Sequence, residues 1–338
     1  MNVTNHGIQE GLISDITLGY IGVVFKLVLN PVLGVMGIYA NIVNVAVFYK
    51  TGLADGVTQN FFILSISDGL VAVTCLVNSV SYILQTRVFV GSEDRQLHAY
   101  VVYWMSIVVV MFPQNISLVT TVMLAVVRCC CVAMPLRVKF LITSRRQLIA
   151  ILLFSVGTTL VLLSTFAPMT ITYVQNYHTN TTYIHFAGFD WPTYTVFASI
   201  SFNVSFIIVI LCLIILSHSL SKSSKFRESS AKGTSCSDSI EQSKDKRRDI
   251  RIVQTVLLVS VVFIGCYLPH IILSVVKTLE KDFSSNGRYR NANKLFLMAN
   301  EMFLLLNVNI NIYIYVYCNV RYRAVFRSMF GLRSQKIT

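Results

Sequence analysis

Long apolar stretches alternate with short polar segments along the whole chain, and this pattern predicts the elements of the fold. A helix needs about 20 mostly apolar residues to cross the hydrocarbon layer of a bilayer. Seven stretches meet this requirement, over residues 24–49, 59–85, 99–127, 147–170, 194–217, 252–276 and 295–318. Because seven is an odd number, we expect the two ends of the chain on opposite sides of the membrane. The pattern predicts an all-α membrane protein that forms a seven-transmembrane helix bundle as a single domain.

The polar segments predict how the spans are connected. Residues 1–23 precede the first span, and residues 217–249 separate the fifth span from the sixth. The second segment is rich in serine and has too few large apolar side chains to fold, so we expect a disordered loop. Within residues 319–338, apolar side chains recur at helical spacing between arginines, at Tyr322, Val325, Phe326, Met329 and Phe330. This spacing predicts a short amphipathic helix on the membrane surface.

Composition and charge set the orientation. Hydrophobic residues make up 54% of the 338 residues and charged residues only 13%. Six Lys and Arg residues in the short connections, nine between residues 222 and 251 and five after residue 318 would share one side, 20 of the 28 in all. Basic residues favour the cytoplasmic side of a membrane, so we expect the N-terminus on the outer side. The positive charge then meets the lipid bilayer rather than nucleic acid, and Asn2 and Asn180 are candidate glycosylation sites.

Two carboxylates and several amides interrupt the apolar spans. Asp68 lies in the second span and Glu301 in the seventh. Ionisable groups inside a bilayer are costly unless they face a partner or water, so both are candidate functional residues. We expect Glu301 either to bind a cationic group of a ligand or to pair with His270 or Lys277. We expect Asn309 to join helices through hydrogen bonds.

Six short motifs in the same order resemble the rhodopsin-like family of G-protein-coupled receptors. The first three are GIYANIVN with Asn41, NFFILSISDGL with Asp68, and AVVRCCCVAMPL with Arg128. The next three are FIGCYLPH, with Tyr267 in place of the family's tryptophan, NVNINIYIY, with Ile312 in place of its proline, and YRAVF. A narrower likeness, to gastropod chemosensory receptors, lies in RCCCVAMPLRVKFLIT, KDKRRDIRIVQTV and FSSNGRYRN.

The resemblance implies a receptor that couples an extracellular small-molecule or peptide ligand to a heterotrimeric G protein and that catalyses no reaction. The ligand would be a chemosensory cue; the alternatives are a neuropeptide receptor of the same fold and a seven-helix channel or transporter. The ligand-binding positions implied by the family are Val110, Gln114, Tyr267, His270 and Glu301. The positions implied for coupling and switching are Arg128, Phe263, Pro269 and Tyr315.

The resemblance also implies an allosteric sodium ion, held by Asp68, Ser117, Asn307 and Asn311. The alternative is a hydrogen-bond network around a protonated Asp68. Two departures from the family pattern concern coupling. Val127 replaces the acid that restrains Arg128 at rest, so we expect raised basal signalling, and Ile312 replaces a proline, so we expect a straighter seventh span. The alternative that the two departures together leave open is a receptor that has lost coupling. Tyr103 stands where the family has a disulfide cysteine, and the outer loops contain no cysteine.

Overall fold

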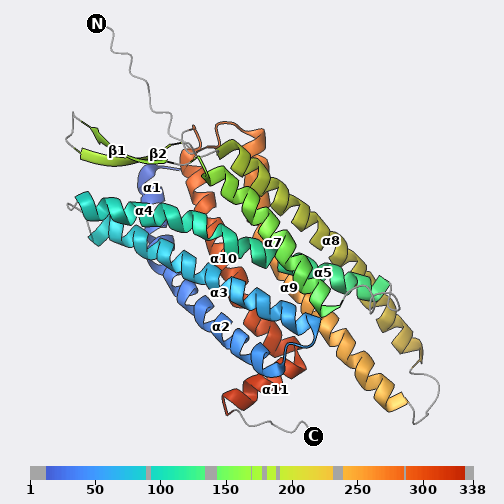
Figure 1. Ribbon diagram of the computed structural model, residues 1–338. Helices are drawn as coiled ribbons and strands as arrows, with labels where there is room; N and C mark the ends of the chain where they lie inside the picture. Colours follow the sequence, from blue (N-terminus) through green and yellow to red (C-terminus); the bar gives the residue numbers. More distant parts are fainter. Residues whose placement is uncertain are drawn as a thin grey trace.

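Long helices lie side by side in one elongated bundle (Figure 1). The computed structural model describes residues 13–88, 93–133, 143–168, 170–176, 181–187, 191–230, 239–284 and 287–331. Within them, seven helical segments have the length and apolar composition to cross a membrane, at Asp15–Thr51, Gly56–Val88, Arg95–Cys131, Ser144–Phe166, Ser199–Ser219, Arg251–Leu279 and Arg290–Cys318. The predicted fold class is confirmed.

The first three spans each combine two or three helical segments. The first consists of α1 (Asp15–Val23), the π-helix η1 (Val24–Leu29) and α2 (Asn30–Thr51). The second consists of α3 (Gly56–Ile83) and the π-helix η2 (Leu84–Val88). The third consists of α4 (Glu93–Val109) and α5 (Met111–Ala133). The break at Val110 follows from Pro113, because proline has no N–H to donate to the carbonyl of Val109.

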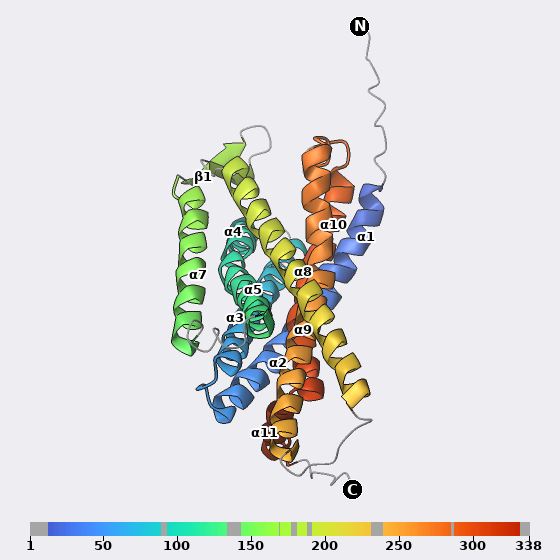
Figure 2. The ribbon, with the colours of Figure 1, turned by 90° about the vertical axis from the view of Figure 1, so that its right-hand side faces the viewer.

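The remaining spans are single helices. They are α7 (Ser144–Phe166), α8 (Trp191–Ser230), α9 (Ser239–Leu279) and α10 (Arg290–Cys318). α5 packs against α3, α7, α8 and α9, so the third span occupies the centre of the bundle, while α7 lies at one edge (Figure 2). The α7 side chains Leu153 and Phe154 are 68% and 64% exposed, as expected for a face that meets lipid.

Close helix approach depends on Gly37 in α2. A Cβ atom there would lie 3.1 Å from the Ala72 Cβ and 3.2 Å from the Asn309 Nδ2. The absence of a side chain therefore lets α2 contact α3 and α10 together. Asn309 donates hydrogen bonds to the carbonyls of Leu33 at 2.9 Å and Leu305 at 2.7 Å, which confirms its predicted role of joining helices.

The two ends of the bundle differ. At one end β1 (Thr170–Asn176) and β2 (Thr181–Ala187) form an antiparallel hairpin, which the sequence pattern did not predict. At the other end lies α11 (Val320–Met329), the predicted amphipathic helix. Figure 1 shows the start of α1 near the hairpin and α11 at the opposite end, as an odd number of spans requires. We refer to these as the hairpin end and the α11 end.

The first helix begins earlier than predicted. It starts at Asp15 rather than at residue 24, so the boundary at 1–23 is wrong for residues 15–23. The physical reason is a helix cap, because the Ser14 Oγ accepts a hydrogen bond from the Thr17 N–H at 3.1 Å. Arg290 forms an ion pair with Asp15 at 3.1 Å, which joins the start of α1 to the start of α10.

The prediction of a disordered loop over residues 217–249 is wrong for most of its length. α8 continues to Ser230 and α9 already begins at Ser239, while residues 231–238 lie outside the described part. Extending an existing helix needs no new nucleation, so residues such as Lys222 and Arg227 can add turns without an apolar face. The fourth span, by contrast, ends at Phe166 rather than residue 170, because Pro168 follows.

Candidate functional site

Asp68 lies at the centre of a hydrogen-bond network that joins three spans. Its side chain is fully buried. The Ser117 hydroxyl on α5 donates to the Asp68 Oδ1 at 2.7 Å, and the Asn311 Nδ2 on α10 donates to the Oδ2 at 2.8 Å. Asn307 is buried on α10, one turn before Asn311. The structure thus brings Asp68, Ser117 and Asn311 together as predicted, with α3, α5 and α10 meeting at the carboxylate.

The chemistry of this network fits a single positive charge. Among the described residues, ion pairs join Lys26 to Glu301 and Arg290 to Asp15, and neither involves Asp68. A fully buried carboxylate without a basic partner requires a cation or a proton. The carboxylate and the Ser117 hydroxyl supply oxygen atoms, the donors that hard cations take. Asn311, in contrast, presents its amide nitrogen to the carboxylate.

An aromatic stack lies at the proline of the sixth span. The rings of Phe263 and Tyr267 lie 4.4 Å apart between centroids, and Phe202 of α8 packs on Tyr267 at 5.8 Å and on His270 at 4.6 Å. Pro269 lies inside α9 next to this stack. Proline removes a helix hydrogen bond, so α9 can bend where its aromatic side chains contact α8.

The predicted ligand-binding residues fall into two groups. Tyr267 and His270 face α8, and the Asn300 Nδ2 lies 3.3 Å from the His270 Nδ1. Gln114 is buried on α5. Val110 and Glu301 belong to the other side of α10: Val110 packs against the cluster that contains Cys75 and Leu305. Glu301 follows Asn300 on α10, and consecutive helical residues point about 100° apart.

Glu301 pairs with Lys26 rather than with His270 or Lys277, so the partner predicted for its ion pair was wrong. The Lys26 Nζ contacts the Glu301 Oε2 and donates to the Asn78 Oδ1 at 2.9 Å. The Lys26 side chain is only 6% exposed and that of Glu301 18%. A charged pair this deep has to be satisfied within the bundle. Lys26 lies in the π-helix η1, a departure from regular α-helix that is frequent at functional sites.

The same cluster extends to the third span. The Asn78 Nδ2 donates to the Ser106 Oγ at 2.9 Å and to the Tyr103 carbonyl at 3.2 Å. The Lys26 Nζ lies 5.7 Å from the centroid of the Tyr103 ring. Spans one, two, three and seven therefore meet through Lys26, Asn78, Tyr103 and Glu301. We call these four residues the Lys26 cluster. The cluster holds Tyr103, which stands where the family has a disulfide cysteine.

Sequence reasoning missed Lys26, and one signal was present. Lys26 is the single basic residue between Ser14 and Lys50, a run otherwise suited to a membrane span. A lone cation in such a run requires a buried anion. Its position at the edge of the predicted first span made it look like an end residue, since helix α1 was placed outside the membrane.

The α11 end holds the predicted switch residue Tyr315. It is fully buried against three rings, with centroid distances of 4.9 Å to Phe61, 5.0 Å to Phe48 and 5.6 Å to Tyr322. The Tyr322 hydroxyl donates to the Asn44 Oδ1 at 2.6 Å, which fixes α11 to α2. α10 runs unbroken past Ile312, as expected where the family's proline is replaced.

Arg128 is half-buried near the end of α5, next to the buried Val127. The candidate glycosylation sites Asn2 and Asn180 lie outside the described residues. None of the described cysteines forms a disulfide bond, and these include Cys129, Cys130 and Cys131. Within the described ranges no group of three or more His, Cys, Asp or Glu side chains gathers as a metal site.

Comparisons with known proteins agree with this architecture. The family model of the seven-transmembrane receptors of the rhodopsin family matches residues 40–315. The crystal structure of squid rhodopsin is similar in fold, with a TM-score of 0.64 and 17% sequence identity over 94% of this chain and 87% of the rhodopsin chain. A search of curated proteins gives no match. Since the family model spans most of the sequence, this chain belongs to the rhodopsin family of seven-transmembrane receptors.

Proposed function

We propose that this receptor transmits the binding of an extracellular chemosensory ligand to a heterotrimeric G protein. Membership of the rhodopsin family makes the chain a G-protein-coupled receptor and not an enzyme, and favours this function over a channel or transporter. The finer assignment to chemosensory ligands rests on the three segments that resemble gastropod chemosensory receptors. The hairpin end would face outward at the plasma membrane and the α11 end the cytoplasm, since most basic residues lie toward the latter.

The observation that carries the mechanism is the aromatic stack of Phe202, Phe263 and Tyr267, which lies beside Pro269 of α9. A ligand bound near Tyr267, His270 and Gln114 would change how Phe202 packs on Tyr267, at 5.8 Å between ring centroids. Pro269 has no N–H to donate to the Gly265 carbonyl, so α9 lacks one helix hydrogen bond at this point. A small shift of the aromatic stack can therefore change the direction of the part of α9 that leads to the α11 end. The ligand acts by binding the active arrangement more tightly than the resting one, which shifts their populations.

Asp68 is the proposed centre of an allosteric sodium site, with Ser117, Asn307 and Asn311 as the other members. The ion would supply the positive charge that balances the buried carboxylate. Ser117 and Asn311 already orient that carboxylate from α5 and α10. Any rearrangement of α10 against α3 therefore has to break contacts to Asp68, which couples the site to activation.

Glu301 contributes to ligand binding less directly than a free carboxylate would. Lys26 already neutralises it, so a cationic ligand group has to compete with a buried ammonium. We therefore place the principal ligand contacts on the Tyr267 and His270 side of α10. The ligand is a small molecule or a peptide, and a peptide active in the assay below would identify the neuropeptide alternative.

The test is an assay of G-protein dissociation in cells with confirmed surface display. Peptides, amines, amino acids and waterborne odorants would be tested against the wild-type chain and Arg128→Ala. We expect a ligand whose response disappears in Arg128→Ala. It should persist in the matched variant Arg145→Ala, because Arg145 is an exposed arginine at the start of α7. Displayed protein that activates none of several G proteins, with or without ligand, contradicts the proposal.

Val127 predicts raised basal coupling. An acidic neighbour would hold Arg128 in the resting state, and valine carries no charge that does so. The variant Val127→Asp should lower ligand-independent nucleotide exchange severalfold, whereas Val127→Leu should leave it unchanged. The measurement is basal guanine-nucleotide exchange per displayed receptor. A wild-type receptor as silent as Val127→Asp contradicts the expectation.

A further inference from the structure

The three residues that lead into α1, residues 13–15, are held against the hairpin ends of α9 and α10. The Asn291 Nδ2 at the start of α10 donates to the Ile13 carbonyl at 2.9 Å and to the Asp15 Oδ1 at 2.7 Å. Figure 2 shows the start of α1 beside the start of α10. The Ile13 side chain packs against a buried cluster from α9, the connecting loop and α10, which consists of Leu273, Phe283 and Ala292. We call residues 13–15 the strap.

The contact between α9 and α10 continues from the strap to the proposed ligand site. Leu273 follows His270 by three residues on α9, so the two side chains share one face of the helix. On α10, Phe296 precedes Asn300 by four residues, and its ring packs on Phe283 at 5.9 Å between centroids. One turn further, the Asn300 Nδ2 lies 3.3 Å from the His270 Nδ1. The strap therefore covers the end of the helix contact that positions His270.

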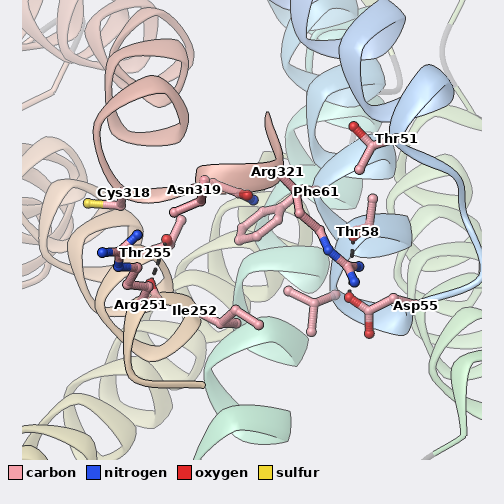
Figure 3. Close-up of a pocket in the computed structure, with 12 residues that line it drawn as sticks. Thr51, Asp55, Thr58, Phe61, Arg251, Ile252, Thr255, Cys318, Asn319 and Arg321 are labelled. Atoms are coloured by element: carbon pink, nitrogen blue, oxygen red, sulfur yellow. Dashed lines mark hydrogen bonds between the residues drawn. The ribbon is translucent and has the colours of Figure 1, made fainter. Parts of the chain in front are cut away.

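The other end of α9 borders a cavity. About 330 Å³ of space opens there, at the α11 end. Figure 3 shows Arg251, Ile252 and Thr255 of α9 on one side of it, facing α3 and the junction of α10 with α11. At the hairpin end, in contrast, Leu273 is only 4% exposed in the cluster that receives the strap. Pro269 lies between these two parts of α9.

We propose that the strap fixes the hairpin-end part of α9, residues 270–279, so that bending at Pro269 moves the part that leads to the α11 end. A helix bends readily where proline removes a hydrogen bond, and the part with fewer packing contacts moves more easily. Ile13 is then a positioning residue, which acts on signalling through α9. The fixing of α9 goes beyond the proposed function, and only the effect on coupling rests on it.

Hydrogen exchange of the purified full-length receptor in detergent micelles tests the fixing of α9. Ile13→Gln places an amide group in the apolar cluster, so it should raise the rate of deuterium uptake in residues 270–284 severalfold. Asn291→Ala removes both hydrogen bonds to the strap and should act in the same direction. Ile16→Gln is the matched control, because Ile16 is 74% exposed. We expect wild-type uptake in Ile16→Gln and in the conservative variant Ile13→Leu.

Basal guanine-nucleotide exchange per displayed receptor tests the effect on coupling. Once the hairpin-end part of α9 is released, that part takes up the bend at Pro269, and less of the motion reaches the α11 end. Ile13→Gln should therefore lower basal exchange severalfold, while Ile13→Leu and Ile16→Gln leave it unchanged. A variant that was merely less stable would be displayed in smaller amounts, but each displayed receptor would catalyse exchange as the wild type does.

Two outcomes overturn the inference. The first is wild-type deuterium uptake in both Ile13→Gln and Asn291→Ala. The second is raised uptake in Ile13→Gln with basal exchange at or above the wild-type rate, because the strap would then not direct the motion of α9. A wild-type receptor without basal exchange contradicts the expectation from Val127 instead. Deuterium uptake still decides in that case whether the strap fixes α9, so the two failures are distinguishable.

Discussion

Lys26→Met should lower the free energy of unfolding by about 3 kcal/mol, because it leaves the Glu301 carboxylate buried without its cation. Glu301→Gln should cost a similar amount, since the Lys26 ammonium, whose side chain is 6% exposed, then lacks its anion. Methionine and glutamine approximate the shapes they replace, so lost packing contributes little. SDS-induced unfolding of the purified receptor measures both values.

The double variant Lys26→Met/Glu301→Gln separates charge from packing. With both charges gone, its stability should recover most of the loss of either single variant. The chain offers an internal control in Arg290→Gln, because the Asp15 and Arg290 side chains are 70% and 53% exposed. An exposed pair contributes only about 0–1 kcal/mol. Additive losses in the double variant, or a loss in Arg290→Gln as large as in Lys26→Met, would contradict a buried ion pair.

The Lys26 cluster also explains how the third span is held at the hairpin end without the family's disulfide. Tyr103 stands at the position of that cysteine, and its carbonyl accepts a hydrogen bond from Asn78 at 3.2 Å. Asn78 in turn accepts one from Lys26 at 2.9 Å. A covalent bond to a loop is thus replaced by polar contacts within the bundle. The hydrogen bonds from Asn78 to Tyr103 and Ser106 join uncharged groups, so the double variant should keep α4 in place.

The spans and the Asp68 network could be predicted from the sequence because each rests on a strong local signal. A continuous apolar run has few alternatives to a membrane helix. Asp68 is a lone carboxylate in such a run, and its contacts with Ser117 and Asn311 follow once the helices are aligned as in the family. The role of Asn309 in joining helices was predictable for the same reason, since a buried amide group needs carbonyl oxygens to accept its hydrogen bonds.

The ion-pair partner of Glu301 could not be predicted in the same way, and neither could the helical structure of most of residues 217–249. Glu301 had several basic residues within reach, and its choice of Lys26 depends on a π-helix that no local pattern encodes. The extension of α8 to Ser230 depends on a helix nucleated inside the membrane, whereas composition alone describes an isolated segment. Both errors have one cause. The interaction that determines each structure involves residues outside the short segment on which the prediction was based.

Sodium should raise the stability of the wild-type receptor and leave that of Asp68→Asn unchanged. The buried Asp68 carboxylate needs a positive charge, and asparagine does not. At a sodium concentration about ten times the dissociation constant, binding contributes about 1.4 kcal/mol of stability. The measurement is the melting temperature in sodium chloride against N-methylglucamine chloride at equal ionic strength. Ser117→Ala keeps the charge but removes an oxygen, so it should retain a smaller sodium effect.

Asn309→Ala provides the matched control for this result. Asn309 is a buried amide on α10, like Asn311, but it donates to the backbone carbonyls of Leu33 and Leu305 rather than to Asp68. Asn309→Ala should lower the melting temperature equally in both salts. Asn311→Ala, in contrast, removes a hydrogen-bond donor from the Asp68 carboxylate. If wild-type receptor melts at the same temperature in sodium and N-methylglucamine, Asp68 holds a proton instead. The Ser117 and Asn311 contacts then form a hydrogen-bond network around a protonated Asp68.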